Sequence, residues 1–213
     1  MTEVNAEIIT PFGPSIFKVK IPNQIVDDLN QYVDKTVADE TKANKLNHGD
    51  QLIGDVTQEF KLEEEFMKQV GWLGFLGNCT SNWIQNVTGK KIKNFALIDS
   101  WIVRQFENEY NPIHYHTGHI SGAGFLKLPS TFGTHVQRKE KEEKDYFGGT
   151  LNLVHGQKSF LSESVFSIKP EVGYFYFFPH YLMHTVYPFK DTSEERRSIS
   201  FNAKIDNEIF EML

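Results

Sequence analysis

The sequence predicts a mainly β fold, either a sandwich or a barrel-like jelly roll, with helices ahead of it. Two observations support this. Short apolar and aromatic runs recur from about residue 92 to 205 between Gly and Pro turns, whereas helical spacing is confined to earlier residues. The chain has 213 residues, of which 39% are hydrophobic and 14% aromatic, including 18 Phe. That composition is sufficient for one domain with a sizeable core.

The expected strands are rich in β-branched and aromatic residues. The first is Asn94–Glu107, and the others cover 121–128, 150–155, 164–168, 173–178, 183–189 and 196–205. A charged stretch, 137–145, interrupts the pattern. We interpret it as a solvated loop or hairpin end, with a mobile flap over a site as the functional alternative.

The N-terminal part predicts two short strands and then helices. Residues 7–20 form the strands around the turn 11–14, and Phe17 and Val19 alternate with lysines as in a half-buried strand. Pro22 begins a helix whose apolar residues recur to Val37. Residues 39–55 predict a loop. Residues 60–90 predict a helix with a break or close contact near its glycines, which are Gly71, Gly74 and Gly77.

Composition disfavours several classes of partner. The net charge of −6 provides no electrostatic footprint for nucleic acid or anionic lipid. Cys79 is the single cysteine, so no intrachain disulfide can form, and we expect a buried, inert thiol in a reducing compartment. Neither a secretory signal nor a membrane-spanning run is apparent, and we expect a cytoplasmic protein.

Three histidines fall within six residues, and two of them predict a metal site. His114 and His116 are two residues apart, so a strand directs both to one face, whereas it directs His119 to the other. Imidazole ligates iron, copper, nickel and zinc. A third ligand is expected from a later loop, at His180 or His184. Taken singly, each histidine is more often a hydrogen-bonded structural residue.

A polar strand face follows twelve residues after His184. Arg196, Ser198, Ser200 and Asn202 alternate with Arg197 and apolar residues, which is unusual for a buried strand unless one face lines a polar pocket. Arginine is suited to bidentate binding of a carboxylate. The alternative is that both arginines pair with nearby Glu194, Glu195 or solvent.

These motifs, in this order, resemble the 2-oxoglutarate and Fe(II)-dependent oxygenase superfamily. The resemblance is strongest to the prolyl hydroxylase-like oxygenases inferred from bacterial and marine-phage genomes, and it covers about residues 95–205. The landmarks are His114-Tyr-His116, Ser121-Gly122, Gly149-Thr-Leu, Lys169-Pro-Glu-Val-Gly173, Phe178-Pro179, His184-Thr-Val-Tyr-Pro188 and Arg196-Arg-Ser-Ile-Ser-Phe-Asn202.

The resemblance implies a double-stranded β-helix at residues 93–205 of a single domain, after strand and helices at 1–92 and before a tail at 206–213. It implies Fe(II), 2-oxoglutarate and O2 as cofactors and hydroxylation of an unidentified substrate. The implied iron ligands are His114, His116 and His184, with no catalytic residue beyond them. Arg196 and Ser198 match the Arg-x-Ser that holds the cofactor's distal carboxylate, and Arg197 replaces Arg196 if the strand register differs by one residue.

The chain departs from the superfamily at the acid ligand, where His116 replaces Asp. The narrower subgroup also carries His-x-His. Three neutral imidazoles leave Fe(II) with a charge of +2 instead of +1. Three alternatives therefore stay open: a jelly-roll binding or structural protein without turnover, a three-histidine metalloenzyme of the cupin kind, and a halogenase-like register at His116-Thr-Gly118. The substrate and a homo-oligomeric state also stay open, as does a host-cytoplasmic location for a phage-encoded chain.

Overall fold

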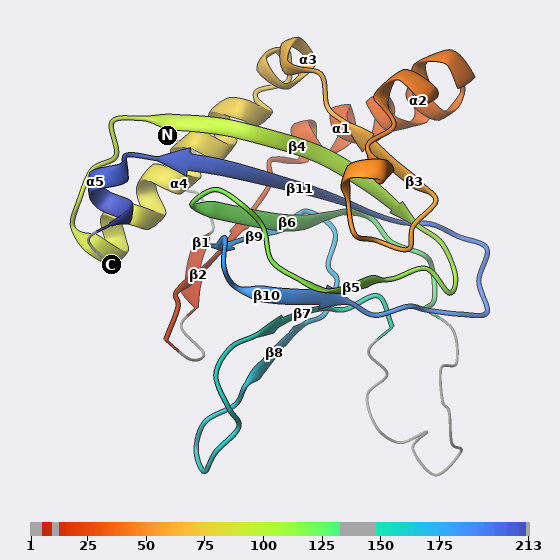
Figure 1. The fold of residues 1–213 in the computed structure, drawn as a ribbon. Coiled ribbons are helices and arrows are strands. Elements are labelled where there is room, and N and C mark those ends of the chain that lie inside the picture. The colour runs from red at the N-terminus through yellow and green to blue at the C-terminus, as the bar shows by residue number, and fades with distance from the viewer. Residues whose placement is uncertain (1–5, 10–12, 133–147, 212–213) are drawn as a thin grey trace.

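The computed structural model describes residues 6–9, 13–132 and 148–211, and it confirms a mainly β fold built from two facing antiparallel sheets (Figure 1). The large sheet has the order β1 (Ala6–Ile9), β2 (Ile16–Lys20), β9 (Tyr174–Pro179), β6 (Ile120–Lys127), β11 (Arg196–Ile205), β4 (Phe95–Gln105) and β3 (Gln58–Lys61). The small sheet has the order β5 (Asn111–His114), β10 (Met183–Val186), β7 (Leu151–Val154) and β8 (Val165–Ile168). This is the double-stranded β-helix that the sequence motifs implied.

Helices lie on the outer face of the large sheet, the face turned away from the small sheet (Figure 1). They are α1 (Asn23–Val37), α2 (Glu40–Leu46), a 3-10 turn η1 (Gly49–Gln51), α3 (Glu64–Gln69) and α4 (Trp72–Thr88), while α5 (Asn207–Phe210) follows the last strand. Leu29 of α1 and Trp72 of α4 pack with Ile199 and Phe201 of β11 in one apolar core. The Trp72 indole N–H donates to Ser100 Oγ at 3.0 Å, which satisfies the indole where it is buried.

A second apolar core lies between the two sheets. It contains Phe125 and Phe178 of the large sheet and Leu151, Leu153 and Val186 of the small sheet. Along β11, Ile199 and Phe201 pack on the helices, so the residues between them face the small sheet. The predicted alternation of the two faces of this strand is therefore confirmed.

Most strand predictions are confirmed, and the errors lie at short local elements. Residues 39–55 are not a simple loop, because α2 and η1 form there, and β3 was not predicted. The predicted break near the glycines of the second helical zone occurs at Gly71, whose φ of +79° ends α3 and begins α4. Cys79 is buried as expected. The charged stretch 137–145 lies outside the described residues.

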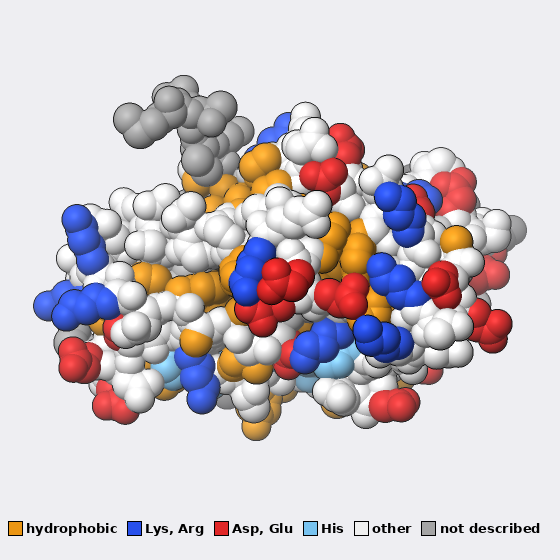
Figure 2. All heavy atoms as spheres, turned by 90° about the horizontal axis from the view of Figure 1, so that it is seen from above, with side chains coloured by type: hydrophobic (Ala, Val, Ile, Leu, Met, Phe, Trp, Pro, Cys, Tyr) orange, Lys and Arg blue, Asp and Glu red, His pale blue; other side chains and the backbone are white. Residues whose placement is uncertain are grey.

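Figure 2 shows the molecule from the side on which the helices lie, and charges of both signs are interspersed on this face. Lysines and arginines are interspersed with aspartates and glutamates on this face, in keeping with 22 basic and 28 acidic side chains in the whole chain. Within the described residues, no helix has both the length and the apolar character needed to span a bilayer.

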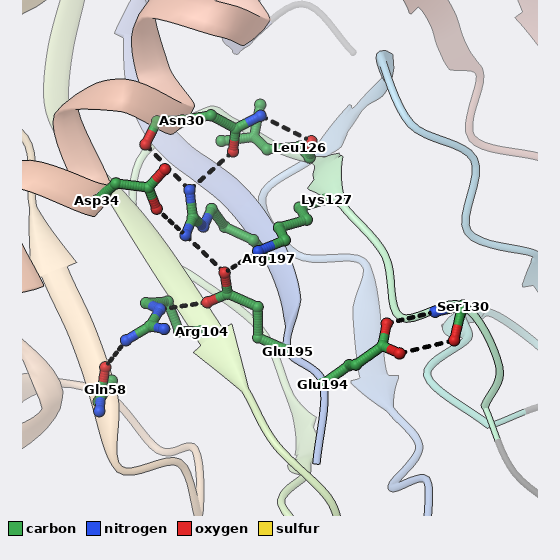
Figure 3. Close-up of polar contacts among 10 residues, drawn as sticks. All are labelled: Asn30, Asp34, Gln58, Arg104, Leu126, Lys127, Ser130, Glu194, Glu195 and Arg197. Atoms are coloured by element: carbon green, nitrogen blue, oxygen red, sulfur yellow. Dashed lines mark hydrogen bonds and ion pairs between the residues drawn. The ribbon is translucent and has the colours of Figure 1, made fainter. Parts of the chain in front are cut away.

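An ion network around the buried side chains of Glu195 and Arg197 ties the start of β11 to α1 and β4 (Figure 3). The carboxylate of Glu195 accepts hydrogen bonds from Arg104, from Lys127 Nζ at 3.0 Å and from Arg197 Nη2 at 2.6 Å. The same Arg197 nitrogen donates to Asp34 Oδ1 of α1 at 2.7 Å. Arg197 is 1% exposed, so its charge depends on these partners.

We expect Arg197→Met to lower the free energy of unfolding by about 3–5 kcal/mol, because Glu195 would lose a partner while staying buried. Lys127→Met is the matched control, since its side chain is 55% exposed and should change stability by about 1 kcal/mol or less. Urea unfolding monitored by circular dichroism measures both. Equal effects of the two substitutions would contradict the assigned role of the network.

Candidate metal centre

The pairing of β5 with β10 brings two histidines together. His184 lies directly opposite His114 in this antiparallel pair. Side chains opposite each other in such a pair have Cβ atoms about 5 Å apart. The two rings accordingly lie with their centroids 4.2 Å apart, although 70 positions separate them in the sequence.

His116 completes a cluster of three imidazoles. It follows β5 by two residues, and its ring centroid lies 4.9 Å from each of the other two rings. One nitrogen from each ring lies within 4.8 Å of the others. Among the described residues, these three histidines form the one group of side chains spaced to hold a metal ion. The structure thus brings together the three histidines expected from the sequence.

In His114 and in His184, a backbone carbonyl determines which ring nitrogen is free to bind a metal. Nδ1 of His114 lies 2.7 Å from the Pro112 carbonyl oxygen, and Nδ1 of His184 lies 2.8 Å from that of Leu182. A carbonyl only accepts, so each Nδ1 carries the hydrogen and each Nε2 presents its lone pair. Nε2 of His184 is 3.1 Å from Nε2 of His116. With metal–nitrogen bonds of about 2.1 Å, two ligands at a right angle lie about 3.0 Å apart, so the spacing fits one octahedral ion.

The three histidines are neutral at neutral pH. Burial and, secondarily, the neighbouring His114 and His116 lower the pKa of His184 to about 3. Burial likewise lowers the pKa of His116 to about 4 and the pKa of His114 below its usual value. A metal ion requires the unprotonated ring, so the cluster is prepared for a cation.

The other two candidate histidines have structural contacts. His119 accepts the Ile205 N–H on Nδ1 at 3.1 Å and stacks on Phe210, so it faces away from the cluster, as its odd spacing predicted. The backbone N–H of His116 donates to the His180 carbonyl at 3.1 Å, and Nδ1 of His180 lies 2.9 Å from the His116 carbonyl oxygen. His180 therefore holds the backbone that carries His116, and His184 is the member of the cluster.

Arg196 lines the same cavity and has no carboxylate partner among the described residues. Its Nε donates to the Gly149 carbonyl at 2.9 Å and its Nη1 donates to Ser198 Oγ at 3.1 Å, with its guanidinium over the Phe125 ring. The side chain is 2% exposed, and burial lowers its pKa to about 9. A buried cation without an anion is costly, so a bound carboxylate fits this position.

The cavity has a volume of about 190 Å³ and opens between the two sheets. The three histidines, Arg196 and Ser198 line it together with Trp101 of β4 and Ser200 of β11. Tyr115 also lines the cavity, whereas Tyr110 and Asn152 do not, and Asn152 bonds to Ser167 and Thr150 instead.

Glu59 of β3 also lines this cavity and was not identified from the sequence. It is 2% exposed, and its Oε2 has no hydrogen-bond partner within the part of the chain that the structure describes. Burial and, secondarily, the nearby Glu109 raise the pKa of Glu59 to about 7. No pattern in the sequence around Glu59 distinguishes it from a surface glutamate. The folded structure was needed to identify it.

Comparison with known proteins agrees with the geometry. The family model described as "Putative 2OG-Fe(II) oxygenase" matches residues 99–202. A prolyl-4-hydroxylase of Pseudomonas putida superposes with a TM-score of 0.58 at 14% identity, covering 94% of this chain and 93% of that one. A viral collagen prolyl hydroxylase of Paramecium bursaria Chlorella virus-1 gives 0.53 at 14% identity, with 92% and 98% covered. AviO1 of Streptomyces viridochromogenes gives 0.56 at 10% identity, with 88% of each covered. No curated protein sequence matches the chain.

The fold and the cluster define a metal-dependent double-stranded β-helix enzyme. Residues 99–202 match the 2OG-Fe(II) oxygenase family, and the enzyme is a 2-oxoglutarate-dependent oxygenase and therefore an oxidoreductase. Its cofactors are Fe(II), 2-oxoglutarate and O2.

Glu59 gives a testable dependence of stability on pH. Its pKa is raised in the folded chain, so the folded state holds the proton more tightly, and stability falls as the pH rises from about 4.5 to about 7. Glu59→Gln removes this loss. We expect the variant to be more stable than the wild type by about 1–3 kcal/mol at about pH 8, and the gain to shrink towards about pH 4. Urea unfolding at both pH values tests this, and a gain that does not change with pH would contradict it.

Proposed function

We propose that His114, His116 and His184 hold the Fe(II), that Arg196 and Ser198 bind the distal carboxylate of 2-oxoglutarate, and that the enzyme hydroxylates its substrate. The observation that carries this proposal is the presence, in one cavity, of three neutral imidazoles and a buried guanidinium that has no anionic partner among the described residues. Fe(II) held by these residues would supply the chemistry by which 2-oxoglutarate and O2 yield succinate and CO2, with one oxygen atom of O2 entering succinate and the other a substrate C–H bond.

The chain's own residues position and shield these reactants. Pro112 and Leu182 orient the rings of His114 and His184 through their carbonyls, so each Nε2 faces the cavity. Arg196, held by Gly149 and Ser198, offers its remaining N–H groups to a carboxylate. Phe178 and Leu151 form apolar walls that limit water around the centre.

The environment of Arg197 favours Arg196 as the carboxylate anchor. Arg197 points to the helix side of β11, where Asp34 and Glu195 already neutralise it. A cupin-like enzyme without 2-oxoglutarate would leave Arg196 buried without a counterion, which disfavours that alternative.

The position of Gly118 favours hydroxylation over halogenation. A side chain at this glycine would lie 2.9 Å from the Ala203 carbonyl oxygen, and its φ is +104°. The turn next to β11 therefore requires a glycine at this position for steric reasons. Gly118 needs no explanation as the glycine that replaces the acid in a halogenase, and this disfavours the halogenase-like register at His116-Thr-Gly118. With His114 and His116 as the pair, an imidazole fills the position where the halogenases leave room for halide.

The cytoplasm is the compartment we propose. The chain has one cysteine, Cys79, and burial raises its pKa to about 12, so it is an inert thiol without a disulfide role.

Loss of an iron ligand tests the metal site. We expect His184→Ala to lower Fe(II) affinity by more than about 100-fold, because losing even a supporting group costs 10–100-fold. His116→Asp should retain Fe(II), since a carboxylate is also a good ligand. Anaerobic titration with Fe(II) and 2-oxoglutarate, followed by the visible charge-transfer band, measures both. His155→Gln is the control histidine outside the cavity, and an equal loss in that variant would contradict the assignment.

Substitution of the arginine tests the cofactor site separately. Arg196→Met should raise the Kd for 2-oxoglutarate at least about 30-fold, as expected for losing a buried charged partner, while Fe(II) affinity stays near that of the wild type. Arg196→Lys should recover part of the affinity, because it restores the charge without the planar fork. Titration of the metal-loaded chain with 2-oxoglutarate gives these constants. Unchanged affinity in Arg196→Met would sink this part of the proposal.

A further inference from the structure

We propose that Glu59 binds a basic nitrogen of the substrate, so that the enzyme acts on a molecule or side chain bearing an ammonium or guanidinium group. This inference rests on the proposed function, because it concerns the part of the cavity that the iron and 2-oxoglutarate leave free. It names the class of substrate that the comparisons do not give.

The register of the large sheet places Glu59 on the same cavity wall as Arg196, the proposed binding residue for the 2-oxoglutarate carboxylate, but at a distance from it. Ser198 of β11 is paired with Val103 of β4, and Val103 is paired with Glu59 of β3. Residues paired in this way share one face, and neighbouring strands are about 4.8 Å apart, so Glu59 lies roughly 10 Å across the sheet from Ser198. Arg196 and Glu59 thus serve different parts of one cavity.

Acidic and basic side chains are scarce in the cavity. Among the described side chains that line it, Glu59 is the one acidic residue and Arg196 is the one basic residue besides the three histidines, and no ion pair joins them. If 2-oxoglutarate satisfies Arg196, the carboxylate of Glu59 stays without a counterion. A buried carboxylate costs several kcal/mol unless it is paired, so a cation is the ligand that would recover this cost.

The neighbouring protein cations are already engaged. Lys61, on the same strand face, pairs with Asp99, and Arg104 bonds to Glu195 and Gln58. Glu109, the charged group that acts on Glu59, is itself negative and bonds to Thr57. No described partner within the protein therefore neutralises Glu59.

An aromatic wall beside Glu59 suits the same ligand. Trp101, two residues before Val103 on β4, lines the cavity, and its ring meets His116 edge-on at 5.6 Å. An indole face attracts an ammonium or guanidinium ion, particularly where water is excluded. Tyr115 and Ile53, which are 64% and 57% exposed, also line the cavity and offer apolar contact to the body of the substrate.

A role for Glu59 as a fourth iron ligand does not fit the structure. The cluster of ligand atoms within 4.8 Å comprises the three histidines, and no carboxylate among the described residues joins them. Glu59 is thus available to the substrate.

The test compares a cation with its neutral counterpart on the full chain. Benzylammonium and benzyl alcohol are close in size, and a cavity of about 150 Å³ suffices for benzene, so both probes suit this cavity. Isothermal titration of the metal-free protein measures their affinities without relying on iron. We expect benzylammonium to bind at least about tenfold more tightly than benzyl alcohol, as for a charge-assisted hydrogen bond.

Variants assign that preference to the carboxylate. Glu59→Gln keeps the shape and should remove the preference, whereas Glu59→Asp keeps the charge and should retain it. Glu64→Gln, on exposed α3, is the control for net charge and should behave as the wild type. Equal binding of the two probes to the wild type, no binding of benzylammonium, or an unchanged preference in Glu59→Gln would each overturn the proposal.

The iron titration separates this inference from the function on which it rests. A charge-transfer band with Fe(II) and 2-oxoglutarate in the wild type, together with absent cation preference, refutes the role of Glu59 alone. Absence of the band refutes the assigned metal and cofactor site, and with it the identification of the bound cation as a substrate.

Discussion

The register between β5 and β10 is the constraint on which the site depends. His114 and His184 face one another because these two short strands pair at that position. Side chains alternate between the faces of a strand, so a slip of one residue would turn His184 away and leave His114 and His116 without a third ligand. The pairing of strands in the small sheet therefore brings the three-histidine cluster together from distant parts of the sequence.

The large sheet supplies the opposite wall through the alternation of β11. Arg196 and Arg197 are adjacent, yet Arg196 lines the cavity without a carboxylate partner among the described residues, whereas Arg197 is neutralised on the helix side by Asp34 and Glu195. Helix packing fixes this orientation, because Ile199 and Phe201 belong to the apolar core under the helices. The packing of the outer core thus decides which arginine can bind a ligand.

Local patterns in the sequence predicted most of the strands, the pair His114 and His116, and a polar strand face beginning at Arg196, whereas the choice of His184 over His180 came from the family resemblance. Spacing by two residues directs His114 and His116 together, and the polar face of 196–202 separates Arg196 from Arg197. Pairing between distant strands is a tertiary property, and β3 shows its effect. Its four residues, Gln58–Lys61, contain one strong strand former and adopt the strand by pairing with β4. Glu59, one of 28 acidic residues, acquires its special environment only through that pairing.

The cavity combines two groups of opposite charge that have no counterion among the described residues. A structural ion pair would bring such charges together, as the network around Glu195 does. Arg196 and Glu59 are instead held apart on one sheet face, each buried and each with its pKa shifted towards the neutral form. Folding pays this electrostatic cost at both positions, and a bound molecule that recovers it gains affinity and orientation. An anion bound at Arg196 and a cation bound at Glu59 would together offset the electrostatic cost of burying these two side chains. Both ligands would then lie in the same cavity as the three imidazoles.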